Sequence, residues 1–342
     1  MTRFFAILAL LLLGAMPFVV HAQRTDYRTM PLPKLVQLAE TGDVRAQFIL
    51  GLRYEKGQGV SQYFRQAVDW YRKAAEQGYA PAQYNLGVMY RDGKGVQQDF
   101  IEAAYWYHEA AEQENKDAQN DLGSMYAMGQ GVTRDFRQAV NWYYKAAEQG
   151  HALAQHNLGI MYAMGQGVPQ DNRQAVIWYR KAAEQKYAPA QTYLGFMYCR
   201  GRGVPQDFRE AAYWYRKAAE QGHADAQNNL GGMYDKGQGV SQDFRLAVNW
   251  WQNAAEQGHA FAQYNLGVAY RKGEGVPQNL VLAYALFSLV AANGDKDAVK
   301  YQNLAAKNMT PEQIEEGKAI ASQWKVGQPL PTTSKTGRAG SR

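Results

Sequence analysis

Histidines, one cysteine and glycine-rich turns are the features of this 342-residue sequence whose types and spacing suit chemistry. His108, Glu109 and Glu112 are spaced like a zinc-binding His-Glu-x-x-His helix, but glutamate stands at the second ligand position, so the metal pair is incomplete. The Gly-x-Gly-Val turns lack the later elements of a phosphate-binding loop. A single cysteine, Cys199, excludes an internal disulfide and a cysteine-rich metal site. We therefore predict no catalytic residue, no cofactor and no metal site.

Three further histidines, His151, His223 and His259, share one repeated position at the start of a predicted helix. We interpret them as exposed or helix-end side chains rather than as metal ligands. Cys199 replaces an alanine of other units, which indicates a small side chain near a helix end, and a covalent link between two chains is the alternative. No nucleophile and base have a spacing suited to catalysis, so we expect a protein that is not an enzyme.

A period of 36 residues organises most of the chain. The dipeptide Ala-Gln recurs seven times at this spacing, followed in phase by Leu-Gly, tyrosine, Gly-x-Gly-Val and a tryptophan-containing segment. Ala82, Leu86 and Tyr90 share one face of a helix, and the glycine pair after them is typical of a helix end. Asp99 is suited to cap a second helix. The sequence thus predicts seven helix–turn–helix units over residues 43–294.

One such unit is too small to bury its own tryptophan and tyrosine, and no disulfide is available to stabilise it. The units must therefore stack on one another around a continuous core. We predict an all-α fold, an α-solenoid with capping segments at residues 23–42 and 295–324. The second helix of the last unit is apolar nearly all round. We expect it to be covered by residues 295–307 and by a helix that begins at Thr310.

The two ends of the chain differ from the repeats. Residues 1–22 combine Arg3, an apolar run and small residues before Gln23, the plan of a secretory signal peptide. An uncleaved membrane anchor is the alternative. No second apolar run of spanning length follows, so we expect an exported protein, periplasmic or secreted, with no membrane span after cleavage. Residues 325–342 have almost no apolar content, and we predict a disordered basic tail.

The formal net charge of +6 lies mostly in these ends. Removing the one charge of Arg3 and the four charges of the acid-free tail leaves +1 for residues 23–324. The repeats are therefore nearly neutral, and we expect no nucleic-acid partner. A basic surface that binds nucleic acid or anionic lipid remains an alternative, and its binding would depend strongly on salt.

The repeated unit, A-x-A-Q-x-x-L-G-x-M-Y-x-x-G-x-G-V followed by D-x-x-x-A-x-x-W-Y-x-K-A-A-E-Q-G, resembles the Sel1-like repeat, a relative of the tetratricopeptide repeat. The resemblance implies a right-handed superhelix that acts as a scaffold or adaptor and binds peptides or proteins on its inner surface. Exported bacterial members imply a role in envelope assembly, signalling or host contact. A cysteine-rich branch binds β-lactams, but this chain lacks those cysteines, so a cell-wall or β-lactam-directed enzyme is the disfavoured alternative.

The variable positions of the first helix, at 81, 84, 88 and 91 in the second unit, lie on one stripe. The resemblance to tetratricopeptide repeats places such positions in the inner groove. Asparagine recurs beside the stripe, where its amide suits the backbone of an extended peptide, and contact with water or a neighbouring helix is the alternative. The mixed aromatic and aliphatic stripe predicts a protein or peptide partner. The candidate groove residues are Phe48, Tyr84, Asn85, Val88, Arg91, Asn120, His156, Asn157, Ile160, Thr192, Phe196, Asn228, Asn229, Tyr264, Asn265, Val268 and Arg271.

Overall fold

A computed structural model describes residues 26–292 and 294–330 of the chain, and within them it contains seventeen α-helices and no strand. The helices are α1 Leu32–Glu40, α2 Val44–Lys56, α3 Phe64–Glu76, α4 Ala80–Asp92, α5 Phe100–Glu112, α6 Lys116–Met128, α7 Phe136–Glu148, α8 Ala152–Met164, α9 Asn172–Glu184, α10 Ala188–Arg200, α11 Phe208–Ala219, α12 Ala224–Lys236, α13 Phe244–Glu256, α14 Ala260–Lys272, α15 Leu280–Ala291, α16 Lys296–Ala306 and α17 Pro311–Gln323.

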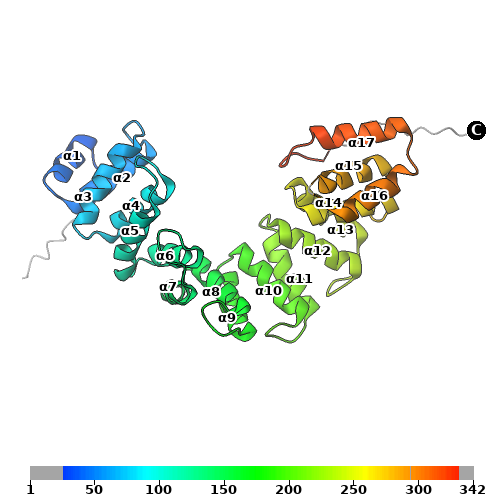
Figure 1. Ribbon diagram of the computed structural model, residues 1–342, viewed down its shortest axis with the longest axis horizontal. Coiled ribbons are helices and arrows are strands. Elements are labelled where there is room, and N and C mark those ends of the chain that lie inside the picture. Colours follow the sequence, from blue (N-terminus) through cyan, green and yellow to red (C-terminus); the bar gives the residue numbers. More distant parts are fainter. Residues whose placement is uncertain (1–25, 293, 331–342) are drawn as a thin grey trace, which may run out of the picture.

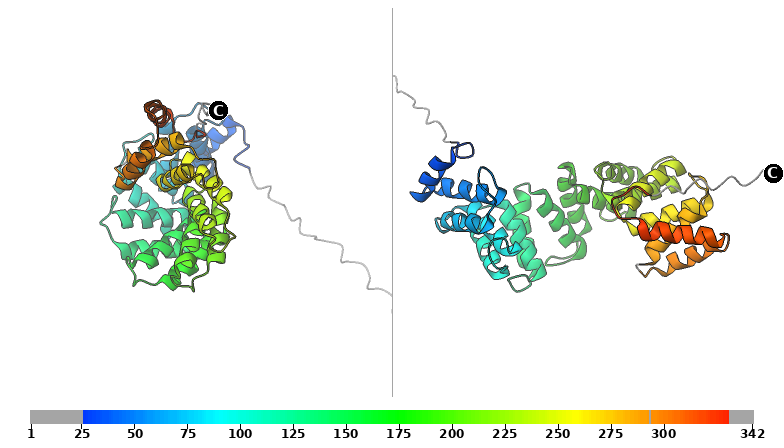
Figure 2. Two further views of the ribbon diagram at one scale, coloured as in Figure 1. Left: turned by 90° about the vertical axis from the view of Figure 1, so that its right-hand side faces the viewer. Right: turned by 90° about the horizontal axis from the view of Figure 1, so that it is seen from above.

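The helices form an open arc of stacked hairpins (Figure 1). From α2 to α14, the even-numbered helices follow the inner side of the arc and their odd-numbered partners follow the outer side. Viewed along the long axis, the chain winds around that axis rather than lying in one plane (Figure 2). The predicted all-α solenoid of helical hairpins is confirmed. The predicted signal peptide, residues 1–22, lies outside the described residues.

The glycine of each Leu-Gly pair allows the two helices of a hairpin to pack closely. A Cβ atom added at Gly87 of α4 would lie 2.6 Å from the ring of Tyr107 of α5, closer than two non-bonded carbon atoms can approach. The ring is fully buried there. The same relation recurs in every hairpin and ends with Gly267 and Phe287 at 2.8 Å. The repeated glycine is therefore a packing requirement of the hairpin.

From the second unit onwards, the second glycine of the Gly-x-Gly-Val turn packs against the previous unit. Gly95 has a φ of +74°, and its added Cβ would lie 2.4 Å from the carbonyl carbon of Phe64 at the start of α3. A side chain at this position would therefore meet both an unfavourable backbone conformation and the backbone of the neighbouring unit. This contact makes successive hairpins stack in one register.

Buried glutamines also run along the array. Gln83 donates from Nε2 to the carbonyl oxygen of Ala75 at 3.2 Å, and its Oε1 accepts from Nε2 of Gln113 at 2.7 Å. The same pair of bonds recurs from Gln47 to Gln227. Each side chain thus satisfies a carbonyl at the end of one helix and links adjacent units, which explains why Ala-Gln and Glu-Gln repeat with the period of the fold.

The C-terminal helices cover the last hairpin as the sequence predicts. Helix α15 is buried at seven consecutive residues from Val281, and α16 and α17 pack against it. Close approach of α17 depends on Gly317, whose added Cβ would lie 2.8 Å from the Tyr284 ring. Helix α17 begins with the predicted capping box, in which Thr310 and Gln313 each bond the backbone of the other.

The prediction of a disordered tail from residue 325 is wrong for residues 325–330. The Gly327 amide donates to the carbonyl oxygen of Glu256 at 2.8 Å, and the Leu330 amide donates to its carboxylate at 3.2 Å. Leu330 also packs into the apolar space formed by α14, α15 and α17. The packing of Leu330 and these bonds hold the segment, while the Val326 side chain is 65% exposed. Residues 331–342 lie outside the described part of the chain.

Candidate partner-binding surface

The residues that suit metal chemistry in the sequence have structural partners. His108 is exposed, with Nδ1 3.8 Å from a carboxylate oxygen of Glu109, and Glu112 pairs instead with Lys145 at 3.6 Å. Over residues 26–292 and 294–330, no three His, Cys, Asp or Glu side chains gather closely enough to hold a metal ion. Cys199 is half-buried and has a free thiol.

The repeated histidines lie at the starts of inner helices. His151 accepts from the Ala154 amide at 3.1 Å through Nδ1, while its Nε2 lies 3.1 Å from Asp117 of the preceding unit. His259 has the same two kinds of contact. Nδ1 of His223 instead lies 3.0 Å from the Thr192 hydroxyl. Burial lowers the pKa of both His151 and His223, which favours the neutral ring. His151 and His259 cap their helices through Nδ1, whereas His223 makes no such bond.

Three of the candidate groove residues are buried between neighbouring units. Asn120, His156 and Thr192 expose only 2%, 6% and 6% of their surfaces. The His156 ring lies among Tyr179, Tyr187 and Tyr193, and burial lowers its pKa to about 4. These three positions therefore stabilise the stack and are not accessible to a partner in this structure.

The asparagines mostly connect one inner helix to the next, as the alternative interpretation of them expects. Asn157 donates to Asn120 at 3.1 Å, and Asn265 donates in the same way to Asn228 at 3.1 Å. A weaker bond of 3.4 Å joins Asn228 to Asn229. Asn85 hydrogen-bonds the side chain of Tyr71. The asparagine side chains thus form hydrogen bonds within the array, which leaves fewer of their donors and acceptors for a partner.

The apolar candidates are half-buried at the edges of the cores. Phe48 packs on Tyr71 and Tyr79, with ring centroids 5.9 and 5.3 Å apart. The Phe196 ring has two guanidinium groups within 6 Å, those of Arg200 and Arg202. Val88 and Ile160 each pack against the hydrophobic core of a hairpin and keep part of their surface exposed. These four side chains keep apolar surface available between the inner helices.

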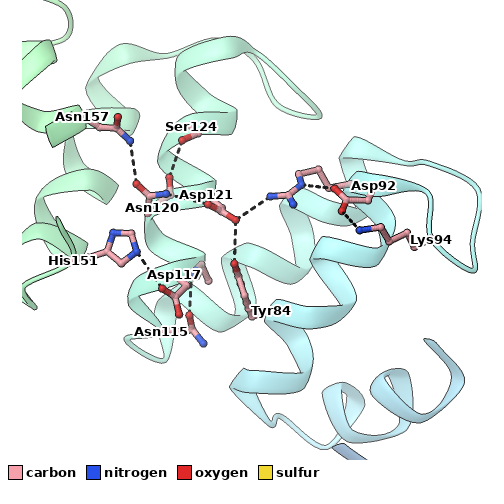
Figure 3. Close-up of polar contacts among 12 residues, drawn as sticks. Tyr84, Asp92, Lys94, Asn115, Asp117, Asn120, Asp121, Ser124, His151 and Asn157 are labelled. Carbon is pink, nitrogen blue, oxygen red and sulfur yellow. Dashed lines mark hydrogen bonds and ion pairs between the residues drawn. The ribbon is translucent and has the colours of Figure 1, made fainter. Parts of the chain in front are cut away.

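Tyr84, Arg91 and Asp121 form a polar junction between α4 and α6 (Figure 3). The Arg91 guanidinium donates to Asp121 at 3.1 Å and to Asp92 at 2.9 Å, and the Tyr84 hydroxyl donates to Asp121 at 3.4 Å. Burial raises the pKa of Asp121, while bonds from Asn120, Arg91 and Tyr84 oppose that shift. We call this group the α4/α6 junction.

Four other candidates meet near the opposite end of the arc. Tyr264, Asn265, Val268 and Arg271 of α14 line a hollow of about 330 Å³ together with residues of α12 and with Tyr301 of α16. The Tyr264 and Tyr301 rings meet edge to face at 5.3 Å. The Arg271 guanidinium lies 5.5 Å from the Tyr301 ring centroid. We call this group the α14/α16 junction.

The Sel1 repeat model matches all seven units, at residues 44–79, 80–115, 116–151, 152–187, 188–223, 224–259 and 260–295. The chain belongs to the Sel1 repeat family. A protective antigen present in uropathogenic Escherichia coli strains, which displays an SLR fold, is 31% identical over 84% of this chain and 85% of that chain, with a TM-score of 0.52. A Sel1 repeat protein from Oxalobacter formigenes is 33% identical over 65% of this chain and 95% of that chain, with a TM-score of 0.58. No curated protein matches the chain.

The inner helices of the Sel1 repeats also expose large apolar side chains that are absent from the sequence prediction. Met128, Met164 and Phe261 are exposed by 64%, 61% and 69%. Leu153 and Tyr193 are exposed to a smaller extent. A comparison between units would have found the methionines, because the last helical position is charged in the other five Sel1 repeats. The array is therefore a Sel1-like scaffold of a kind suited to protein–protein interaction. None of the described helices has the length and apolarity needed to cross a membrane.

Proposed function

We propose that this protein is an exported, non-catalytic Sel1-like scaffold that holds a protein or peptide partner along the inner face of its arc. The observation that carries the proposal is the exposure of large apolar side chains on inner helices. Met128, Leu153, Met164 and Tyr193 come from the three consecutive inner helices α6, α8 and α10. Helix α8 between the other two contains no Asp, Glu, Lys or Arg. A partner would remove this apolar surface from water.

The place of action that we propose is the cell envelope or the outside of the cell. The signal-peptide pattern of residues 1–22 supports export. The similar Escherichia coli protein is described as a protective antigen, which supports a location where a host can meet the protein. Cell fractionation combined with N-terminal sequencing tests this point. We expect a mature chain that begins at Gln23, whereas an intact N-terminus in the cytoplasm would contradict export.

A photo-cross-linking experiment tests the use of the inner face. A cross-linkable amino acid replaces Met164 on inner helix α8, and the matched control replaces Ile177, which is 47% exposed on outer helix α9. We expect the same defined protein adduct in the producing cell only from position 164. Equal adducts from both positions, or adducts from position 177 alone, would place the partner elsewhere.

The absence of catalysis is tested with a fluorescent penicillin. The disfavoured alternative, a β-lactam-directed enzyme, requires covalent acylation or turnover of this probe. We expect neither, because the residues that carry the repeat have packing and capping roles throughout the described hairpins. A labelled band that a competing β-lactam removes would overturn this part of the proposal.

A further inference from the structure

Helix α16 has the register of the first helix of an eighth unit. Both α6 and α16 begin with Lys-Asp-Ala, and their capping residues, Asn115 and Asp295, each accept a bond from the amide of that alanine. Asp121 of α6 and Tyr301 of α16 therefore occupy equivalent positions. Each lies thirty residues after an arginine of the preceding inner helix, Arg91 or Arg271.

The two arginines differ in their partners. Asp121 supplies a carboxylate to Arg91 at 3.1 Å and to the Tyr84 hydroxyl at 3.4 Å. At the α14/α16 junction the equivalent residue is a tyrosine, and Arg271 makes no ion pair with any residue of the described chain. Its Nε is shielded from solvent and has no hydrogen-bond partner among those residues. An arginine held this way lacks the anion that its planar donors suit.

Space for that anion lies beside Arg271. The hollow of about 330 Å³ borders Gly232 of α12, where a Cβ atom would meet no other atom within 4 Å. The equivalent positions in the other six units carry Leu52, Val88, Ser124, Ile160, Phe196 and Val268. The lack of a side chain at Gly232 therefore leaves open a part of the inner face that is partly filled elsewhere.

The charged side chains that line the hollow have more positive than negative charges, although Asp295 and Asp297 also act on Tyr264. Three cationic side chains, Lys236, Arg271 and Lys272, and two acidic ones, Asp235 and Glu274, line it. Glu274 is already paired with Lys272 at 3.2 Å. Asn265, whose Nδ2 donates to Asn228, and the two tyrosines of the junction also line the hollow beside Arg271. A small anion with two acceptor oxygens suits this arrangement.

We propose that the α14/α16 junction binds a carboxylate of the partner peptide in the hollow beside Tyr301, where the carboxylate pairs with Arg271 as Asp121 pairs with Arg91. This inference rests on the proposed function and assigns one contact within the inner face. The partner carboxylate completes an interaction that the chain makes for itself at the α4/α6 junction. Apolar side chains of the same peptide extend from there towards the exposed residues of α10 and α8.

Binding of short peptides to the full chain tests the assignment. The side-chain N–H signals of arginine are followed by NMR during titration with three probes, each N-acetylated. The first is Ala-Asp-Ala amide, the second is Ala-Ala-Ala with a free C-terminal carboxylate, and the control is Ala-Asn-Ala amide. We expect the Arg271 signal to shift saturably with a carboxylate probe and to stay in place with the asparagine control. The first two probes distinguish a side-chain carboxylate from a chain terminus.

Two variants keep the test independent of folding. Arg271→Gln should weaken carboxylate binding about tenfold or more, because a charge-assisted bond is lost. Gly232→Val should also prevent binding, because its side chain fills part of the hollow. This variant should still fold, since an added Cβ meets no atom within 4 Å and valine is tolerated within a helix. Arg91→Gln is the matched control and should leave probe binding unchanged. An unmoved Arg271 signal, or equal shifts with the asparagine probe, would overturn the proposal.

The outcome separates this site from the proposed function. Cross-linking from position 164 without carboxylate binding at Arg271 would retain the inner face and reject the α14/α16 site. Carboxylate binding that Arg271→Gln abolishes, without any adduct from position 164, would retain the site and reject the broader use of the inner face.

Discussion

The α4/α6 and α14/α16 junctions are built from the same repeat positions, yet one contains its own carboxylate and the other does not. Tyr84 and Arg91 meet Asp121, whereas Tyr264 and Arg271 meet the ring of Tyr301. The constant residues of a repeat array fix where side chains lie, and a change at one position decides whether a junction is complete or can accept a ligand.

The largest loss of stability should come from replacing the glycines that make the same close hairpin contact at both junctions. Gly87→Ala and Gly267→Ala place a Cβ 2.6 Å from the Tyr107 ring and 2.8 Å from the Phe287 ring. Each substitution should lower the free energy of unfolding by about 2 kcal/mol through overpacking. Urea denaturation measures this loss. Full tolerance of alanine at only one of the positions would show that the two junctions do not share a scaffold.

Replacing the arginines should separate the junctions. Arg91→Gln leaves the half-buried Asp121 carboxylate without its guanidinium partner and should lower the free energy of unfolding by about 1 kcal/mol. Arg271→Gln breaks no ion pair among the described residues and should change stability by less than about 0.5 kcal/mol. Thermal denaturation of the two variants under one condition measures the difference. Equal losses would mean that Arg271 has an intramolecular partner.

The pH dependence of stability should differ in the same way. Burial raises the pKa of Asp121, so the folded protein binds this proton more tightly than the unfolded chain does. The stabilisation that this bound proton gives the folded protein is fully present below the ordinary pKa of 3.8. It is lost as the pH rises through the raised pKa of Asp121. Asp121→Asn removes this dependence.

Urea denaturation at a series of pH values, with wild type and variant compared at each, measures the Asp121 contribution. The stability of wild type relative to Asp121→Asn should fall as pH rises through that window. Tyr301→Phe is the control at the other junction and should leave the acid profile unchanged, because it changes no carboxyl group. A difference between wild type and Asp121→Asn that stays constant with pH would contradict the buried carboxyl.

The turns that lead into α6 and α16 should show the smallest effect. Glu114 adopts a φ of +63° before α6, where the equivalent residue before α16 is Gly294 with a φ of +86°. Glu114→Gly should raise the free energy of unfolding by about 0.5–1 kcal/mol, because glycine adopts this conformation without a Cβ clash. Gly294→Glu should lower it by a similar amount. Opposite signs for the pair in thermal denaturation would reject the equivalence of the turns.

Much of the fold could be predicted because the repeat shows the same local pattern in every unit. Helix faces, the glycines at helix ends and the apolar surface of α15 all depend on short-range spacing. The tail was predicted less well, since the order of residues 325–330 depends on the packing of Leu330 and on bonds to Glu256, more than seventy residues earlier in the chain. Composition alone does not reveal such contacts.

The binding surface could be predicted only in part, because spacing shows which side chains share a helix face but not how closely the next helix packs. Asn120, His156 and Thr192 belong to the variable stripe and are nevertheless buried between units. The register of α16 was also missed. Gln302 and Asn303 stand where the seven units have Leu-Gly, so the most visible marker of a first helix is absent there.

The affinity of the Tyr301→Asp variant for N-acetyl-Ala-Asp-Ala amide is the most direct test of the difference between the two junctions. The new side chain places a carboxylate at the position that Asp121 has in α6, thirty residues after the arginine that it should neutralise. We expect it to pair with Arg271 and to weaken probe binding about tenfold or more relative to wild type. Unchanged affinity in a variant that retains its helical content would contradict the account.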